Sequence, residues 1–226
     1  MIRKINLRQA IATSFFITLT LIMGFGFFES SILRAVEDQF TITQTITSEI
    51  SFVTTTNDVT MSGSIAGLTG GVAYGSTTVR IFTNDNAGFT ATIKASSSPA
   101  MQGNSQGGSI ADYTPAVAGV PDFAYSVPTG EEFGFTVVAS NTPDMAQKFK
   151  DNGAVCNHPT ATLDTNTSAT CWMGLSTTAT STLVTSTFTA ASGATSTLVF
   201  RTTVNSGSSL PEDTYVATTT ITATTN

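Results

Sequence analysis

Charged residues are scarce in this sequence. Only 11% of its 226 residues are Asp, Glu, Lys or Arg, against about 25% in a typical soluble protein. Four of the nine basic residues lie before position 36, so the remainder carries five basic residues against fourteen acidic ones. Such a chain lacks the positive patch that binds a nucleic-acid backbone. The composition therefore excludes nucleic acid as a partner.

Histidine and cysteine are nearly absent, with one His and two Cys. Cys156, Cys171 and His158 lack the ligand number and the short Cys-x-x-Cys spacing of a zinc site, so we expect no metal ion or other cofactor. The two cysteines bracket a polar segment that burial alone would not order. We therefore predict a disulfide between Cys156 and Cys171 that closes the loop 156–171, in an oxidising compartment.

The one long apolar run is N-terminal. Residues 10–28 are uncharged and follow the basic MIRKINLRQ, as in a secretory signal peptide cleaved after Ala35. The run is also near the roughly 20 residues that span a bilayer. Residues 1–35 are thus either a signal peptide or a retained membrane anchor with its N-terminus inside. Both place residues 36–226, expected to form one domain, in the extracellular medium or at the cell surface.

Threonine fills much of the surface that charge would otherwise occupy, with 44 residues. Its branched Cβ stiffens an extended backbone and suits the wet face of a strand. The final stretch, EDTYVATTTITATTN, alternates apolar residues with threonine, which is typical of a half-buried strand. We expect it to complete a sheet beside the first strand of the chain.

The longest alternating segment is FTITQTITSEISF, residues 40–52. We predict one strand here, with four threonines on one face and these apolar residues on the other: Phe40, Ile42, Ile46, Ile50 and Phe52. Cleavage after Ala35 would leave this strand free to pair with a sheet edge on a neighbouring subunit. The interpretation we favour over such a filament is that the strand pairs within its own domain and the apolar segment stays as a membrane tether.

Further strands are predicted at short, regular spacing between turns rich in Gly, Ser and Asn. The segments 76–82 and 89–95 are expected to form a hairpin around Asn84–Gly88, whose residues tolerate positive φ. Three more strands are expected, at residues 132–140, 181–188 and 196–204. Only 142–153 has helix signals, with Thr142 as cap, Pro143 in the first turn and Gly153 as stop.

These patterns predict an all-β fold. Strands without βαβ alternation indicate an antiparallel β-sandwich, Ig-like or jelly-roll-like, preceded by the N-terminal hydrophobic helix. The connection 96–130 is long, with a short strand expected at 123–127, and loops of this length are usually functional or inserted.

One motif in this connection matches a hydrolase signature. GNSQG, residues 103–107, has the G-x-S-x-G form in which Ser105 would be the nucleophile. Its flanks are neither a strand nor a helix, and His158 lies in the loop between the cysteines. We interpret the motif as a glycine-rich loop and expect no enzymatic activity; a hydrolase using Ser105 is the rival hypothesis.

Acidic and aromatic residues give two weaker signals. Glu131 and Glu132 project to opposite faces of a strand, so they do not form an acid–base pair, and we place Asp112 and Asp122 in solvated turns. Five aromatic residues could line a glycan site: Tyr74, Tyr113, Phe123, Tyr125 and Trp172. We favour the interpretation that they are scattered over the core and its rim. We expect Trp172 to pack on the disulfide. Residues 166–168 have the form of a glycosylation sequon.

Five stretches carry a resemblance: QTITSEISF, AGLTGG, TNDNAGFTATIKASSSPAMQGN, GGSIADYTPAVAGVPDFAYSV and PEDTYVATTTITATTN. They resemble a family of uncharacterised secreted or surface β-sandwich proteins predicted in ultrasmall, uncultivated bacteria of candidate phyla. The resemblance covers most of the chain beyond about residue 40 and implies no catalytic residue. The chain is also loosely similar to wall-binding sandwich domains of Gram-positive bacteria, although Trp172-Met173-Gly174-Leu175 departs from their W-x-L motif.

The sequence thus predicts a non-catalytic structural protein of the cell surface. Self-association as a subunit of a surface layer or filament is the expected role, with the membrane as a further partner through residues 10–28 if that segment is retained. A surface adhesin or glycan-binding module is the alternative.

Overall fold

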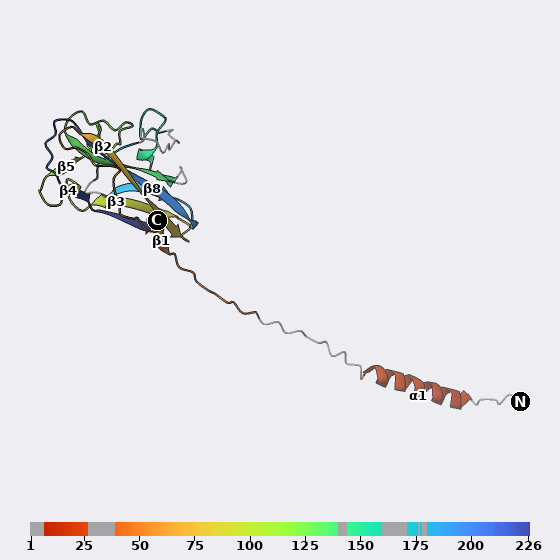
Figure 1. Cartoon of the computed structure of the whole chain (residues 1–226). Helices are drawn as coiled ribbons and strands as arrows, with labels where there is room; N and C mark the ends of the chain where they lie inside the picture. The colour runs from red at the N-terminus through yellow and green to blue at the C-terminus, as the bar shows by residue number, and fades with distance from the viewer. Residues whose placement is uncertain (1–6, 27–38, 140–143, 160–170, 176, 178–179) are drawn as a thin grey trace. The chain divides into compact units, whose positions relative to one another are not determined.

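The computed structural model describes residues 7–26, 39–139, 144–159, 171–175, 177 and 180–226 (Figure 1). The chain divides into two compact units, Met1–Thr45 and Ile46–Asn226. The first unit contains α1 (Leu7–Gly26), in which the Thr18 hydroxyl donates a hydrogen bond to the carbonyl of Ser14 one turn earlier. Of the helices in the described residues, none is long and apolar enough to span a membrane.

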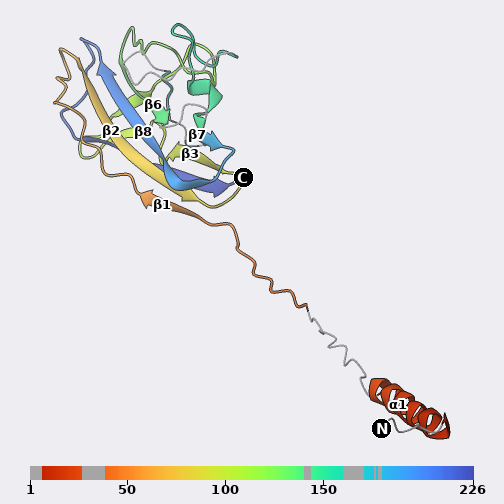
Figure 2. The same ribbon diagram turned by 90° about the vertical axis from the view of Figure 1, so that its right-hand side faces the viewer.

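The second unit consists mainly of strands, which form two sheets in its described residues (Figures 1 and 2). The seven-stranded sheet has the order β1 (Ile50–Thr54), β2 (Gly71–Thr83), β8 (Ala190–Val204), β6 (Glu131–Ala139), β5 (Ser109–Asp112), β4 (Met101–Gly103) and β9 (Tyr215–Ala217). The three-stranded sheet has the order β10 (Thr219–Thr225), β3 (Phe89–Ala95) and β7 (Ser181–Ser186).

Alternate residues of both sheets build one apolar core. On β3 the core face is Phe89, Ala91, Ile93 and Ala95, all buried, which the alternation with Thr90, Thr92 and Lys94 predicts. The large sheet contributes these buried residues to the same cluster: Val79, Ile81, Phe133, Phe135, Val137, Leu198 and Phe200. The predominance of strand agrees with the sequence-based prediction.

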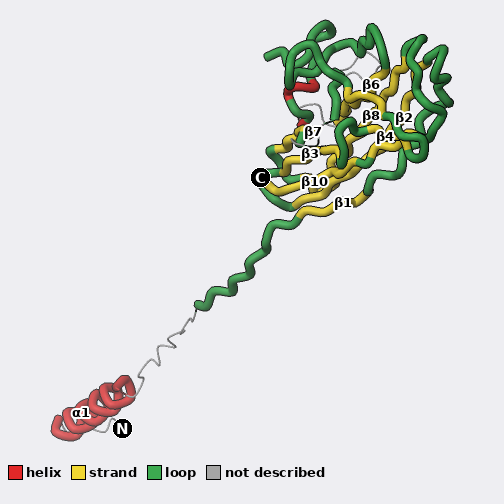
Figure 3. Tube along the Cα trace, turned by 90° about the vertical axis from the view of Figure 1, so that its left-hand side faces the viewer, coloured by secondary structure: helices red, strands yellow, loops and turns green. Residues whose placement is uncertain are grey.

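The C-terminal stretch belongs to both sheets. β9 pairs with β4, and after Thr218 the chain continues as β10, which pairs antiparallel with β3 from Thr219↔Ala95 to Thr225↔Phe89. The Ser96 N–H donates a hydrogen bond to the Thr218 carbonyl at this corner. β10 lies next to β1 (Figure 3), yet β3 is its hydrogen-bonded partner. The last strand thus completes a sheet, as expected, but its partner in that sheet is β3 and not the first strand of the chain.

The predicted hairpin 76–95 is also wrong, because its two strands lie in different sheets. β2 pairs with β1 and β8, whereas β3 pairs with β10 and β7. Both hydrogen-bonding edges of each strand are thus taken by other partners. The turn residues 84–88 carry the chain from one sheet to the other.

Two further expectations need correction. The connection 96–130 is not one loop, because it contains β4 and β5, and β5 pairs in parallel with β6. The sheets are therefore not entirely antiparallel. At 123–127 the chain forms no strand; only Asp122 makes a β-bridge, to Trp172.

The predicted helix 142–153 is wrong for its described residues, which contain the 3₁₀ turn Gln147–Phe149 and no α-helix; Thr142 and Pro143 lie outside the described residues. Met145 forms a β-bridge to Val184, and the Ala146 N–H donates to the Leu183 carbonyl. The segment therefore lies extended along the outer edge of β7, where tertiary hydrogen bonds override its helical signals.

Candidate functional site

The segment before β1 contains most of the predicted assembly strand. Residues 39–49 belong to no strand in the described structure, and β1 begins only at Ile50. Phe40, Ile42 and Ile46 are 81%, 83% and 83% exposed. The predicted strand 40–52 is therefore wrong for its first ten residues. The physical reason is that Ile50 pairs with Thr83, the last residue of β2, so the preceding residues extend past the end of their partner.

A small set of hydrogen bonds attaches the residues just before β1 to the end of β2. The Asn84 side chain accepts a hydrogen bond from the Glu49 N–H at 2.6 Å and donates one to the Thr47 carbonyl at 3.1 Å. The Thr83 hydroxyl donates to the Glu49 carbonyl at 2.7 Å. These bonds continue the β1–β2 pairing through side chains and hold Thr47–Glu49 extended.

The edges of β1 and β10 form an incompletely covered rim of the core. We name it the β1/β10 rim and define it by Ile50 and Phe52 on β1 and Ile221 and Ala223 on β10. Phe52 lies opposite the buried Ile81 but is itself 38% exposed. The other three residues are half-buried against the main core. Within the described residues no ladder joins β1 to β10, so both backbone edges remain unpaired along this rim.

The G-x-S-x-G motif lies in a turn between two strands. β4 ends at Gly103 and β5 begins at Ser109, and the N–H groups of Ser105 and Gln106 donate to one Asp213 oxygen at 2.8 Å and 2.7 Å. These hydrogen bonds lower the pKa of Asp213. Ser105 thus occupies a hairpin turn and not the strand-to-helix turn of a nucleophile elbow. Asp213 is distant from Ser105 in the sequence, and no local sequence pattern predicted this contact.

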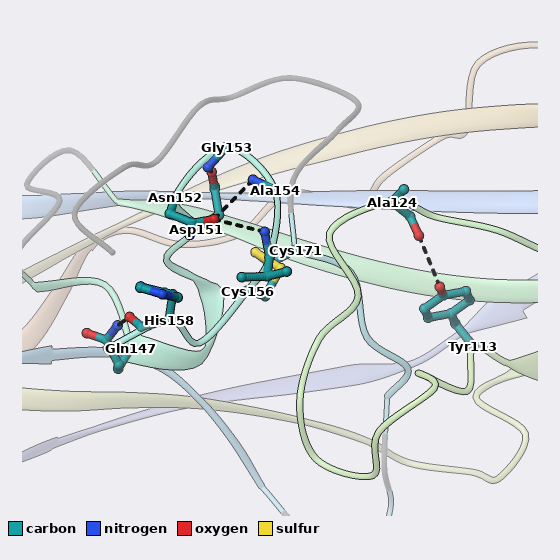
Figure 4. Close-up of a disulfide and its surroundings, with 11 residues drawn as sticks. Tyr113, Ala124, Gln147, Asp151, Asn152, Gly153, Ala154, Cys156, His158 and Cys171 are labelled. Atoms are coloured by element: carbon teal, nitrogen blue, oxygen red, sulfur yellow. Dashed lines mark hydrogen bonds between the residues drawn. A yellow bond between two sulfur atoms is a disulfide. The ribbon is translucent and has the colours of Figure 1, made fainter. Parts of the chain in front are cut away.

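The predicted disulfide is confirmed. Cys156 and Cys171 are bonded, with their Cα atoms 5.8 Å apart, and both belong to the main core (Figure 4). The His158 carbonyl accepts a hydrogen bond from the Gln147 side chain at 2.7 Å (Figure 4). Residues 160–170, including the sequon 166–168, lie outside the described residues. A disulfide indicates an oxidising compartment.

Three of the five aromatic residues form a second buried cluster on the outer face of β6. Tyr113 stacks on Tyr125 with ring centroids 4.3 Å apart, and Trp172 meets Tyr125 edge-on at 5.4 Å. A Cβ at Gly134 would lie 2.9 Å from both tyrosines, so this glycine allows the rings to approach the sheet. The expectation for Trp172 is wrong: Cys171 packs in the main core and Trp172 in this cluster, because neighbouring residues of an extended chain point to opposite faces.

The acidic residues near this cluster make structural hydrogen bonds. Asp122 accepts from the Tyr113 hydroxyl at 2.8 Å, and Asp112 accepts from the Ala100 N–H at 2.9 Å. Burial raises the pKa of Asp112 and of Glu132. No group of three His, Cys, Asp or Glu side chains suited to a metal ion occurs in the part of the chain that the structure describes.

One aromatic residue remains accessible beside a cation. The Arg201 guanidinium lies 4.5 Å from the Tyr125 ring centroid and 5.3 Å from that of Tyr74. Tyr74 is 36% exposed and Phe123 is partly buried against the main core. The rings therefore hold Arg201 on the outer face of β8 through cation–π contacts.

Comparison with protein-family models, with curated proteins and with solved structures finds no match to this chain.

Proposed function

We propose that this chain is a non-catalytic structural protein that self-associates outside the cytoplasm, as a subunit of a surface layer or filament. The observation that carries the proposal is the segment 40–46, whose apolar residues alternate with threonine and are more than four-fifths exposed. Burying one large apolar side chain is worth about 1.5–3 kcal/mol. Phe40, Ile42 and Ile46 together therefore offer a substantial driving force for pairing with another sheet.

The rest of the chain is consistent with this role. We assign residues 36–226 to an extracytoplasmic β-sandwich, Ig-like or jelly-roll-like, which the two sheets around one core support. Residues 1–35 are the signal peptide or the membrane anchor. The disulfide supports an extracellular or cell-surface location.

Substitution of the exposed apolar residues tests the proposal. The full chain is secreted from a bacterial host, and its assemblies are measured by light scattering and negative-stain electron microscopy. The variant Phe40→Ser/Ile42→Ser/Ile46→Ser is expected to remain monomeric, because the apolar face of the donated strand is removed. The matched control, Thr41→Ser/Thr43→Ser/Thr45→Ser, changes the opposite face and is expected to assemble like the wild type. Equal assembly of both variants overturns the proposal.

A second candidate function is binding of an acidic glycan. Tyr74 offers an exposed ring for stacking on a sugar, and Arg201, for which no ion pair is found among the described residues, offers a donor for a carboxylate. A screen of uronic-acid and neutral glycans tests it. Binding of acidic glycans that Tyr74→Ala abolishes supports this function; no binding to any glycan excludes it.

A further inference from the structure

We infer that the segment 40–46 of one copy pairs with the free edge of β10 in a second copy; this inference rests on the proposed self-association. Among the described residues, β10 forms a ladder on one edge, with β3, while β1 lies next to its other edge without a ladder. Its core-facing Ile221 and Ala223 stay half-buried. An added strand would enter between β1 and β10, which must separate to admit it, pair with the unused backbone groups of β10 and cover these side chains.

The dimensions of donor and acceptor agree. β10 is seven residues long, and the segment 40–46 has the same number of residues. Both alternate with a period of two, with threonine on the wet face. When Phe40, Ile42 and Ile46 point toward the core, the threonines of both strands form one continuous exposed surface.

Other sheet edges fit less well. The edge of β7 is covered by the extended segment at Met145 and Ala146. β9, the outer strand of the large sheet, has only three residues. β1 has five residues and is continuous with the donor segment. Among the strands of the described residues that lie at the margin of a sheet and have one edge without a ladder, β10 is thus the longest.

Nothing on β10 discourages edge pairing. Proteins usually protect free edges with lysine, other charges or proline. The strand TTITATT contains none of these residues. Its exposed side chains are Thr220, Thr222 and Thr224, which carry no charge that would repel another strand.

The hydrogen bonds of Asn84 favour a second copy as the acceptor. Folding back onto β10 of the same chain requires a reversal close to Ile46. Thr47 and Glu49 are hydrogen-bonded to the Asn84 side chain, so a reversal at these residues would break those bonds. Each copy then provides one donor and one acceptor, and repetition of this head-to-tail contact generates a filament.

Cross-linking between two differently substituted full chains tests the acceptor. One chain carries Thr43→Cys on the wet face of the donor, and the co-secreted chain carries a cysteine at Thr220, Thr222 or Thr224. A short bismaleimide joins neighbouring thiols and leaves the native disulfide intact. The control chain carries Thr185→Cys, an exposed position on β7.

We expect a heterodimeric product with at least one β10 position, on the order of tenfold more abundant than with Thr185→Cys. The product should disappear when the donor also carries Phe40→Ser, Ile42→Ser and Ile46→Ser. Assemblies that form without any β10 cross-link, or with equal cross-linking at Thr185→Cys, overturn the acceptor but leave self-association standing. Absence of assemblies in every mixture overturns both.

Discussion

The side chain of Asn84 binds the backbone of Glu49, 35 residues earlier in the chain. Its Oδ1 accepts the Glu49 N–H at 2.6 Å, while its Nδ2 donates to the carbonyl of Thr47 at 3.1 Å. A carboxamide has both an acceptor and donors, so its oxygen and nitrogen can take the place of the backbone carbonyl and N–H of a paired strand residue. Asn84 therefore extends the β1–β2 pairing beyond Thr83, to Glu49 and Thr47.

Asn84→Ala is expected to loosen this attachment. Each hydrogen bond contributes about 1 kcal/mol, so amide exchange at Glu49 should accelerate by roughly tenfold while exchange in the core strand β8 stays unchanged. Hydrogen exchange followed by mass spectrometry measures this. Asn86→Ala is the matched control, because it lies in the same turn and the structure gives its side chain no hydrogen bond. Equal exchange in both variants would contradict the assigned role of Asn84.

Removal of the disulfide is expected to destabilise the second unit. Cys156 and Cys171 are 15 residues apart, and closing a loop of this length is worth about 3 kcal/mol in the chain-entropy estimate. The variant Cys156→Ser/Cys171→Ser should lose about that free energy of unfolding in urea denaturation. Because both sulfurs are buried in the core, buried hydroxyls add to the loss. A change below about 1 kcal/mol would show that the bond does not stabilise the fold.

Local alternation predicted the strands better than it predicted their partners. The core faces of β3 and β8 follow from a period of two, because each strand buries one face. The pairing partners depend on long-range contacts. The Asn84–Gly88 turn has the composition of a hairpin, yet it joins two sheets, since β2 and β3 find other neighbours.

The sequence predicted which apolar residues belong to the candidate site, but not where the strand β1 begins. The residues Phe40, Ile42 and Ile46 were identified by their pattern alone. That β1 begins only after these residues depends on where β2 ends, since its last residue, Thr83, lies opposite Ile50. Asp213 was missed for the same reason, because it holds Ser105 across a separation of 108 residues and no local pattern encodes that contact.

Gly134→Ala is expected to disturb the outer aromatic cluster. The new Cβ would lie 2.9 Å from atoms of Tyr113 and Tyr125 and 3.2 Å from the Met173 carbonyl oxygen. The Cβ of Tyr113 and the ring of Tyr125 must move away from β6, and overpacking of this kind costs about 1–3 kcal/mol. The fluorescence of Trp172, which contacts Tyr125, reports the movement. An unchanged emission spectrum together with unchanged urea stability would show that the cluster adapts without cost.

The buried tyrosines predict a loss of stability in alkali. Burial, and then the hydrogen bond to Asp122, raise the pKa of Tyr113 to about 12, while tyrosine in an unfolded chain has a pKa of about 10. Between these two pH values the unfolded chain loses the proton and the folded chain keeps it. The contribution of Tyr113 to the free energy of unfolding is therefore fully present below a pH of about 10, and it is lost as the pH rises toward about 12.

Tyr113→Phe removes this titrating group and should make the alkaline decline shallower. Part of the decline should remain, because burial also raises the pKa of Tyr125. Urea denaturation of wild type and variant at pH of about 9 and about 11 gives the two slopes. The variant is expected to be less stable at the lower pH, since Asp122 loses its hydroxyl donor, and to lose less on going to the higher pH. Parallel declines in both proteins would mean that Tyr113 ionises equally readily in the folded and unfolded chains.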